Sequence, residues 1–344
     1  MIDNGLAYKA LALQVTCFAI NQSRDRQEAR SRMKTAIDRL EQQIAASLAF
    51  IGSNCRLIVL PEYFLTGFPI GESLEEWAEK ACLDMAGSEY EALGNIAQKY
   101  RIFLAGNAYE IDPHFPGLYF QTCFVLDPSG SIVLRYRRLN SLFAPTPHDV
   151  WDQYLEHYGL DGVFPVARTE IGNLAAVASD EILFPEVARC LAMRGAEVLI
   201  HPTSEVYGQA RSPKEAAKIS RAVENIVYVI SANTAGIANS AIPIASVDGG
   251  SKIVDYRGLV LAETGAGESM AAFAEVDLGA LRRYRRQPGL GNLLARQRFD
   301  AYAESYQDSQ FYPRNTMLKG SIERKHFIQT QLATIEHLAQ NGVI

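Results

Sequence analysis

The sequence predicts a layered α/β fold, and three observations support this prediction. Strand and helix signals alternate along most of the chain. The alternation occurs in both halves, which indicates strands inside and helices outside. Short apolar runs end in polar residues, so polar side chains lie at the carboxyl ends of strands, where the functional sites of such folds are usually found. With 344 residues, 48% of them apolar, the chain can bury a sizeable core.

The first half of the chain begins with a strand over 10–15, followed by a long helix. One face of this helix is marked by apolar residues three and four positions apart, namely Met33, Ile37, Leu40, Ile44, Leu48 and Ile51. A strand then leads to Glu62. The remaining elements are expected, in chain order, as helices over 74–85 and 89–100 and strands over 103–109, 119–127 and 132–136. The turn Asp127-Pro-Ser-Gly130 has the chemistry of a hairpin between the last two strands.

The second half repeats this order. Its elements are expected as a strand over 174–177, a helix over 185–193, and strands over 197–201, 227–231, 252–255 and 259–262. A further helix precedes the third of these strands. Ser212 can cap it, with Pro213 in its first turn and Glu215 three residues after the cap, and the helix should run to about residue 224.

Bulk composition narrows the classes of partner. The formal charge of −6 and the pI near 5.6 argue against binding to nucleic acid or an anionic membrane, so small molecules or proteins are the expected partners. No apolar run approaches the ~18 residues that a membrane-spanning helix needs. Residues 1–5 lack the basic and then apolar layout of a signal peptide, so a cytoplasmic location is expected.

The cysteines favour reduced thiols over a disulfide framework, because they are odd in number and widely scattered: Cys17, Cys55, Cys82, Cys123 and Cys190. No pair of them has zinc-ligand spacing, and the six histidines are equally dispersed. We therefore expect no metal site.

Three segments carry the side chains that are the best candidates for catalysis. Residues 57–67 form an apolar strand that delivers Glu62 at its end. Residues 130–138 form a turn and a strand that ends in cations. Residues 172–186 form a buried strand that turns sharply into a helix and places Ser179 at the turn. Together these segments resemble the nitrilase, or carbon-nitrogen hydrolase, superfamily.

This resemblance implies a fold and a site. Members of that family take a four-layer α-β-β-α sandwich, and the resemblance covers roughly residues 7–278. The first segment supplies a glutamate base, the second a lysine and the third a cysteine nucleophile. Glu62 matches the first of these, whereas an alignment without gaps puts Arg138 at the lysine position and Ser179 at the cysteine position. The expected substrate is a small amide, nitrile or related acyl compound, and no cofactor is implied.

Ser179 leaves three functions open. A serine hydroxyl needs stronger general-base help than a cysteine thiol, and that help usually comes from a histidine. In the first interpretation Ser179 is the acyl acceptor, Glu62 is the base, and Arg138 with backbone donors stabilises the anion. In the second, the chain is a catalytically silent binding or assembly protein. In the third, catalysis is non-covalent and Ser179 only binds the substrate. Whether the chain is an enzyme stays open, with hydrolysis the leading interpretation.

Two acids follow Ser179 directly. Glu181 fits an acidic position of the family and is expected to hold nearby backbone or Arg138. Asp180 stands where the family usually has an aromatic residue, which changes the pocket wall. Arg137 should point to the opposite strand face from Arg138 and serve the structure.

Other side chains are candidates for substrate binding. The loop after Arg138 offers Asp149 or His148 as a second acid or base, with Glu156 as a third candidate. The segment after strand 197–201 should line the pocket through His201, Glu205 and Tyr207, and Asn233 resembles a motif near the site. Four aromatic residues hint at an aromatic pocket or belong to the core: Trp77, Phe143, Trp151 and Tyr207. Cys190, inside a predicted helix, is an unlikely substitute nucleophile.

The chain end is expected to extend beyond the main domain. We assign residues 1–285 to the hydrolase-like domain and residues 286–344 to a helical extension. Its last part has an apolar face at helical spacing, formed by Ile322, Phe327, Ile328, Leu332, Ile335 and Leu338. This face packs either on a second copy of the chain, giving a homodimer or higher homo-oligomer, or on its own domain.

Overall fold

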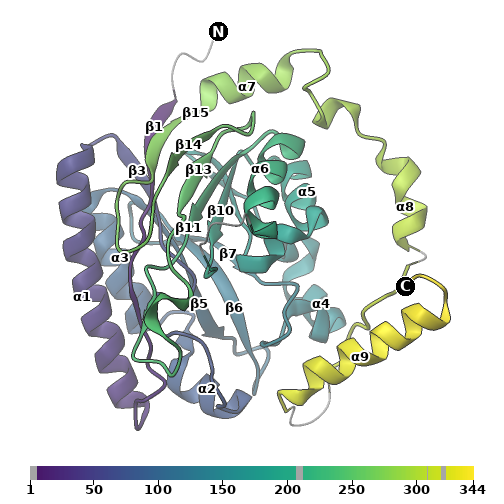
Figure 1. The fold of residues 1–344 in the computed structure, drawn as a ribbon, viewed down its shortest axis with the longest axis horizontal. Coiled ribbons are helices and arrows are strands. Elements are labelled where there is room, and N and C mark those ends of the chain that lie inside the picture. Colours follow the sequence, from purple (N-terminus) through teal and green to yellow (C-terminus); the bar gives the residue numbers. More distant parts are fainter. Residues whose placement is uncertain (1–5, 207–211, 308, 319–322) are drawn as a thin grey trace.

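Two β-sheets lie face to face in the computed structural model, and helices cover their outer faces (Figure 1). The structure describes residues 6–206, 212–307, 309–318 and 323–344. The predicted four-layer α-β-β-α sandwich is confirmed. Its layers follow from the sequence pattern, because strands with two buried faces need apolar cover on both sides.

The first sheet has the strand order β15-β1-β3-β5-β6-β7. Strands β1, β3 and β5 are parallel, and β6 runs antiparallel to both β5 and β7. The bounds are β1 Ala7–Ala12, β3 Cys55–Val59, β4 Leu83–Asp84, β5 Phe103–Ile111, β6 Tyr119–Leu126, β7 Ile132–Arg137 and β15 Phe273–Asp277. The short β4 pairs with β5 beside the main path.

The second sheet has the order β14-β13-β11-β10-β9-β8, with β9, β10 and β11 parallel. The bounds are β8 Ala167–Thr169, β9 Gly172–Ala176, β10 Val198–Pro202, β11 Tyr228–Ala232, β13 Lys252–Val254 and β14 Val260–Glu263. Two short strands, β2 Cys17–Phe18 and β12 Ile237–Ala238, pair with each other.

The described helices are α1 Arg26–Ile51, α2 Leu74–Ala81, α3 Ser88–Tyr100, α4 Trp151–Val163, α5 Pro185–Met193, α6 Pro213–Asn225, α7 Leu278–Arg286, α8 Phe299–Gln307 and α9 Lys325–Gln340. Helices α1 and α3 cover the first sheet, and α5 and α6 cover the second (Figure 1). The predicted apolar face of α1 is buried on the first sheet except for Leu48, which is half-buried.

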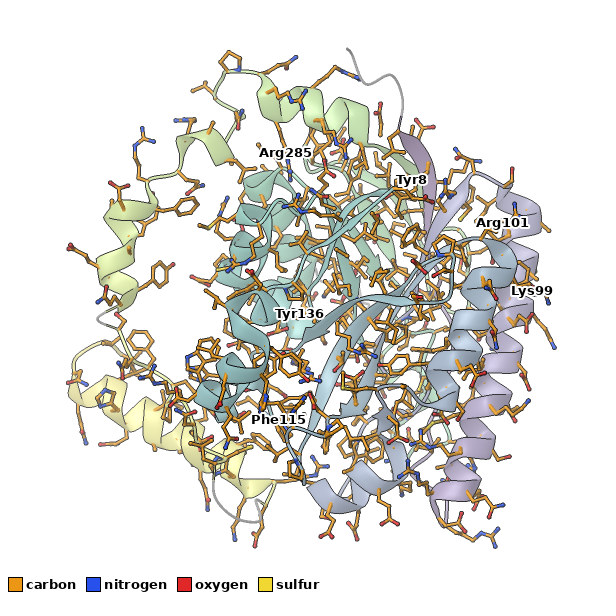
Figure 2. All side chains as sticks on the ribbon, turned by 180° about the vertical axis from the view of Figure 1, so that it is seen from behind. Tyr8, Lys99, Arg101, Phe115, Tyr136 and Arg285 are labelled. Atoms are coloured by element: carbon orange, nitrogen blue, oxygen red, sulfur yellow. The ribbon has the colours of Figure 1, made fainter. Side chains whose placement is uncertain are left out.

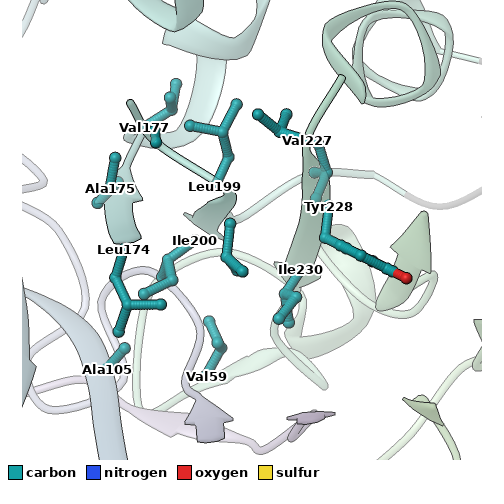
Figure 3. Close-up of a cluster of buried hydrophobic side chains, with 14 of the residues drawn as sticks. Val59, Ala105, Leu174, Ala175, Val177, Leu199, Ile200, Val227, Tyr228 and Ile230 are labelled. Atoms are coloured by element: carbon teal, nitrogen blue, oxygen red, sulfur yellow. The ribbon is translucent and has the colours of Figure 1, made fainter. Parts of the chain in front are cut away.

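The core between the sheets is apolar and closed to solvent. Val59 and Ala105 of the first sheet face Leu174, Ile200 and Ile230 of the second (Figure 3), and each of these side chains has no exposed surface. Burial on this scale, at about 25 cal/mol per Å² of apolar surface, fixes the two sheets relative to each other. It therefore also fixes the strand ends that carry the polar side chains.

Some predicted boundaries were wrong. The helix expected over 74–85 ends at Ala81, because Cys82 is extended and Leu83 and Asp84 pair with β5 as β4. The first strand begins at Ala7 rather than at residue 10, and pairs with β15 from its start. Ser212 caps α6 as predicted, accepting a hydrogen bond from the backbone of Glu215.

The C-terminal residues follow α7 as two separated helices, α8 and α9, which lie along the rim of the sandwich (Figure 1). Phe327 is buried against the main core, whereas Leu332 is 60% exposed and Ile328 and Ile335 are each about half exposed. Ile322 lies outside the described residues. Among the helices that the structure describes, none is long and apolar enough to span a membrane.

Candidate active site

Three strand ends bring the candidate side chains together. Glu62 follows β3, Arg138 follows β7 and Ser179 follows β9. Strands β3 and β7 run in the same direction within the first sheet, and the second sheet packs against them, so their carboxyl ends meet at one edge of the sandwich. Glu62, Arg138 and Ser179 are all buried there, with at most 5% of each residue exposed.

Glu62 is held by an amide and a guanidinium. Gln121 Nε2 donates to Glu62 Oε1 at 2.5 Å, and Arg138 Nη1 lies 3.5 Å from the same oxygen. The backbone N–H of Glu62 donates to Thr203 of the other sheet at 3.3 Å. The next residue, Tyr63, has a positive φ of 61°, so the chain turns sharply at this point. Glu62 is thus fixed between the two sheets.

Arg138 uses all three guanidinium nitrogens. Nε donates to the Asn140 carbonyl at 2.8 Å, Nη1 donates to Gln121 Oε1 at 2.7 Å, and Nη2 forms an ion pair with Asp180. Burial lowers the pKa of Arg138, but Glu62 and, to a smaller extent, Tyr63 and Glu181 together more than offset this, and the pKa lies above its usual value. Arg138 therefore contributes fixed positive charge to the site, while its N–H groups are engaged in holding the site together.

Arg137 points away from the site, as predicted. Its guanidinium pairs with Asp112 at 2.6 Å and with Glu110 at 3.4 Å. It also lies over the rings of Phe120 and Tyr158 at 4.7 and 4.9 Å from their centroids. Its role is to join β7 to the outer layer.

Ser179 has a strained backbone. Its φ is 50°, in the left-handed region that residues other than glycine seldom occupy. It begins a short 3-10 helix, Ser179–Leu183, between β9 and α5. Its carbonyl accepts a hydrogen bond from His201 Nε2 at 2.7 Å, and Lys214 Nζ donates to its hydroxyl oxygen at 3.2 Å. Such strain costs ~1–3 kcal/mol and is typical of functional positions.

Glu181 fastens the Ser179 turn to the loop after β7. Its Oε1 accepts from the backbone N–H groups of Leu139 and Asn140, both at 2.8 Å. Tyr136, labelled near the centre of the molecule in Figure 2, donates its hydroxyl to Glu181 Oε2 at 2.7 Å. Burial raises the pKa of Glu181, and Arg138 partly counters this effect. The prediction that Glu181 holds nearby backbone therefore agrees with the structure.

His201 supports the Ser179 turn through the backbone. Its Nδ1 lies 2.9 Å from Ser231 Oγ, and its Nε2 is bonded to the Ser179 carbonyl rather than to the hydroxyl. Full burial lowers the pKa of His201 well below its usual value, and Lys218 lowers it further. His201 is thus neutral near pH 7 and positions Ser179 without contacting its hydroxyl.

Glu205 belongs to a buried ion network. Its carboxylate pairs with Lys218 Nζ at 2.5 Å, and Lys218 also pairs with Glu215 at 2.7 Å. Asn233 bonds both the N–H and the carbonyl of Glu205, each at 2.9 Å. Glu205 and Asn233 hold the loop after β10 in place. Tyr207, the third candidate of this loop, lies outside the described residues.

The loop after Arg138 presents its acids differently from the prediction. Asp149 Oδ2 accepts from Thr146 and Oδ1 from Thr316, both at 2.7 Å, so its carboxylate is a cap and a tie to the C-terminal segment. His148 is half-buried and packs near Trp151, with 5.7 Å between ring centroids. Glu156 is exposed on α4.

A cavity of about 650 Å³ adjoins the buried cluster. Its walls combine the loop after β7, the Ser179 turn and the C-terminal segment, and its lining includes Asn140, Trp151, Asp180, Phe184, Tyr312 and Arg314. Asp180 joins the cavity to the cluster because it is half exposed and pairs with Arg138. Of the other predicted aromatics, Trp77 is fully buried in the core and Phe143 is 68% exposed.

Lys214 is the residue that sequence reasoning missed. It stands in the first turn of α6, directly after Pro213, and is half-buried beside Ser179. A lysine at this place opposes the helix dipole, which disfavours cations in a first turn. That conflict was the signal in the sequence. Within the described parts of the chain, no group of three or more His, Cys, Asp or Glu side chains is arranged to hold a metal ion.

Comparison with known proteins identifies the class to which this fold and site belong. A sequence model of the carbon-nitrogen hydrolase family matches residues 14–286, so the chain belongs to this family and its function is of the carbon-nitrogen hydrolase type.

Individual relatives are more distant. The omega-amidase NIT3 of Saccharomyces cerevisiae is 26% identical over 254 residues, which cover 73% of this chain and 84% of the yeast protein. The omega-amidase NIT2 of Danio rerio is 27% identical over 236 residues, covering 69% and 81%. The crystal structure of a carbon-nitrogen hydrolase from Helicobacter pylori G27 superposes with a TM-score of 0.65 at 23% identity, covering 87% of this chain and 98% of the other.

Proposed function

We propose that this protein hydrolyses the carbon-nitrogen bond of a small amide through a covalent intermediate on Ser179. The observation that carries this proposal is the Ser179 turn. The hydroxyl stands on a strained left-handed residue after β9, at the edge of the sandwich where β3 ends before Glu62 and β7 ends before Arg138. Its relatives among the omega-amidases point to amides in preference to nitriles. In this proposal Arg138 and Ser179 stand at the lysine and cysteine positions of the family.

Each residue of the cluster has a role in this reaction. Ser179 accepts the acyl group. The negative charge of Glu62 favours removal of the proton from the Ser179 hydroxyl. Arg138 supplies positive charge near the carbonyl oxygen as it becomes an anion. Because its nitrogens are already bonded, backbone N–H groups of the Ser179 turn provide the direct donors to that oxygen.

The cavity beside Asp180 is the proposed place for the rest of the substrate. A volume of about 650 Å³ suits a small molecule. Trp151, Phe184 and Tyr312 offer apolar walls, and Arg314 offers a cation for a polar end. The C-terminal segment would then shape substrate selection directly.

The test is turnover on a panel of small amides and nitriles, measured as ammonia release with intact-protein mass. We expect release by the wild type, an acyl adduct on Ser179, and loss of turnover in Ser179→Ala and Glu62→Gln. Cys190→Ser is the control, because this half-buried thiol lies in α5 away from the Ser179 hydroxyl, and the variant should keep full activity.

Two outcomes would replace the proposal. Turnover that survives Ser179→Ala would show non-covalent catalysis. Silence of the wild type across the panel, with activity appearing only in Ser179→Cys combined with Arg138→Lys, would show a binding protein built on the hydrolase fold.

We also propose that the protein works as a homo-oligomer in the cytoplasm. The exposed apolar side chains of α9, Ile328, Leu332 and Ile335, are suited to a second copy of the chain. All five cysteines are free, which suits a reducing compartment. Sedimentation of Leu332→Glu with Ile335→Glu should give a smaller species than the wild type, and an unchanged species would contradict the association through α9.

A further inference from the structure

Helix α6 carries three basic side chains that contact the Ser179 turn or the carboxylates beside it. Lys214, Lys218 and Arg221 are spaced by four and three residues and so share one helix face. Arg221 donates to the carbonyls of Ile182 and Leu183 at 2.9 and 3.0 Å. Lys218 is paired with two carboxylates. Lys214 differs from both, because its amine contacts the Ser179 hydroxyl itself.

The other polar groups near Ser179 are already committed. His201 is bonded to the serine carbonyl, so it does not serve the hydroxyl. Glu62 Oε1 is bonded to Gln121 and lies beside Arg138. A carboxylate is also a weak base for a serine hydroxyl, whereas an amine with a lowered pKa matches it better. Lys214 Nζ, at 3.2 Å from Oγ, is within hydrogen-bond distance of the proton to be moved.

We propose that Lys214 is a catalytic residue, the general base and then the general acid of the Ser179 reaction. This inference rests on the proposed function and adds the path of the proton. The neutral amine takes the Oγ proton while Oγ bonds to the acyl carbon and the carbonyl electron pair moves to oxygen. When the carbon-nitrogen bond breaks, the Lys214 ammonium gives the proton to the leaving nitrogen. Water then adds to the ester, loses its proton to Lys214, and the proton returns to Ser179 as the acid leaves.

The electrostatic surroundings suit an amine that cycles between its two forms. Burial lowers the pKa of Lys214, while Glu62 and Glu205 raise it, and Arg138 and Lys218 lower it. The net shift is downward, which increases the fraction of free amine near neutral pH. Glu62 stabilises the ammonium once it forms. This combination explains how a lysine can sit in the first turn of a helix that disfavours cations.

The experiment uses a fluorophosphonate, which needs no knowledge of the substrate. Ser179 Oγ displaces fluoride from phosphorus, and intact mass with peptide mapping locates the adduct. The rate is measured from pH 6 to 10 in the wild type, Lys214→Arg, Lys214→Met, Lys214→Ala and Lys34→Met. Arginine keeps the cation but cannot act as a base. Lys34 lies on the exposed face of α1 and is the matched control.

We expect labelling at Ser179 in the wild type and in Lys34→Met, with a rate that rises with pH through one ionisation. Lys214→Arg and Lys214→Met should react at least ~100-fold more slowly and lose that rise, as removal of a general base predicts. Added methylamine should restore part of the rate to Lys214→Ala but not to Lys214→Arg. A lysine that only supports the structure would not give this rescue.

The outcomes separate the two proposals. Wild-type labelling at Ser179 with an unchanged rate in Lys214→Arg would overturn the role of Lys214 and leave the serine nucleophile standing. No labelling of Ser179 in the folded wild type would overturn both. Should Lys214→Met fail to fold, Lys214→Arg decides, because it keeps a long side chain that can donate to the Ser179 hydroxyl.

Discussion

Removing the Glu181 carboxylate should destabilise the protein by about 3 kcal/mol. Glu181→Ala leaves two backbone N–H groups and the Tyr136 hydroxyl without their acceptor. Each buried unpaired donor costs ~1–3 kcal/mol, with the low end for Leu139 and Asn140 because they are half-buried and water can reach them. Burial also raises the pKa of Glu181, so removing the charge returns some free energy.

Glu181→Gln is the matched comparison. Its carbonyl oxygen can keep the two backbone donors, and its amide can donate to the Tyr136 oxygen, so only the charge is lost. We expect a cost of about 1 kcal/mol. Urea unfolding followed by circular dichroism separates the variants. With a slope near ~3 kcal/mol per M, Glu181→Ala should lower the midpoint by ~1 M and Glu181→Gln by a third of that.

A double-mutant cycle with Tyr136→Phe tests the cause. Tyr136→Phe should cost ~1 kcal/mol in the wild type and much less in Glu181→Ala, because its partner is already gone. Equal midpoints for Glu181→Ala and the wild type would refute the reasoning, as would a full additive cost of Tyr136→Phe in Glu181→Ala.

The remaining predictions concern buried charges, a buried histidine and backbone strain. Arg137→Ala should cost ~3 kcal/mol in urea unfolding, because the buried Asp112 loses its guanidinium partner, whereas Glu110 keeps its ion pair with Arg135, while Lys34→Ala on exposed α1 should leave the midpoint unchanged. His201 has a lowered pKa in the folded state, so the unfolded chain binds its proton more readily and stability should fall as pH drops below the ordinary histidine range. Replacing it by glutamine should remove up to ~1.4 kcal/mol per pH unit of that slope in urea titrations between pH 7 and 5, and an unchanged slope would contradict the assignment. Ser179→Gly should be more stable than Ser179→Ala by ~1 kcal/mol in the same assay, since both lose the Lys214 contact and only glycine accepts the positive φ without strain; equal stability would show that the turn is unstrained.

The layered fold was largely predictable from the sequence, because hydrophobic periodicity is a local signal. The apolar face of α1 recurs along a helix of 26 residues, and the start of α6 is signalled by Ser212, Pro213 and Glu215, which lie within four positions of one another. The end of α2 was not predictable in this way. Cys82 leaves the helix because Leu83 and Asp84 pair with Glu110 and Ile111, nearly thirty residues away.

The site was predictable only where its residues end a predicted strand. Glu62, Arg138 and Ser179 share this property, and they do lie together. Asp149 was a plausible acid by its place in a loop, but its carboxylate is taken up by Thr146 and Thr316, the latter 167 residues further on. Lys214 comes from the start of α6, 35 residues after Ser179, and nothing in its immediate sequence places it at Ser179. Such contacts depend on how elements far apart in the sequence pack together, which is a long-range property.

The ion pair between Arg138 and Asp180 has a consequence for how this site can change over generations. On the proposed alignment both residues depart from the family pattern, in which a lysine and an aromatic residue stand at these positions. A lysine at 138 has one nitrogen in place of three, so it could not keep the separate contacts with Asn140, Gln121 and the half-exposed Asp180. An aromatic residue at 180 would leave Arg138 Nη2 without its carboxylate partner, although Glu62 would still lie beside Nη1. Either single replacement removes contacts that hold the site together, so residues 138 and 180 form a coupled pair, and we expect the site to accept a change at one of them only together with a change at the other.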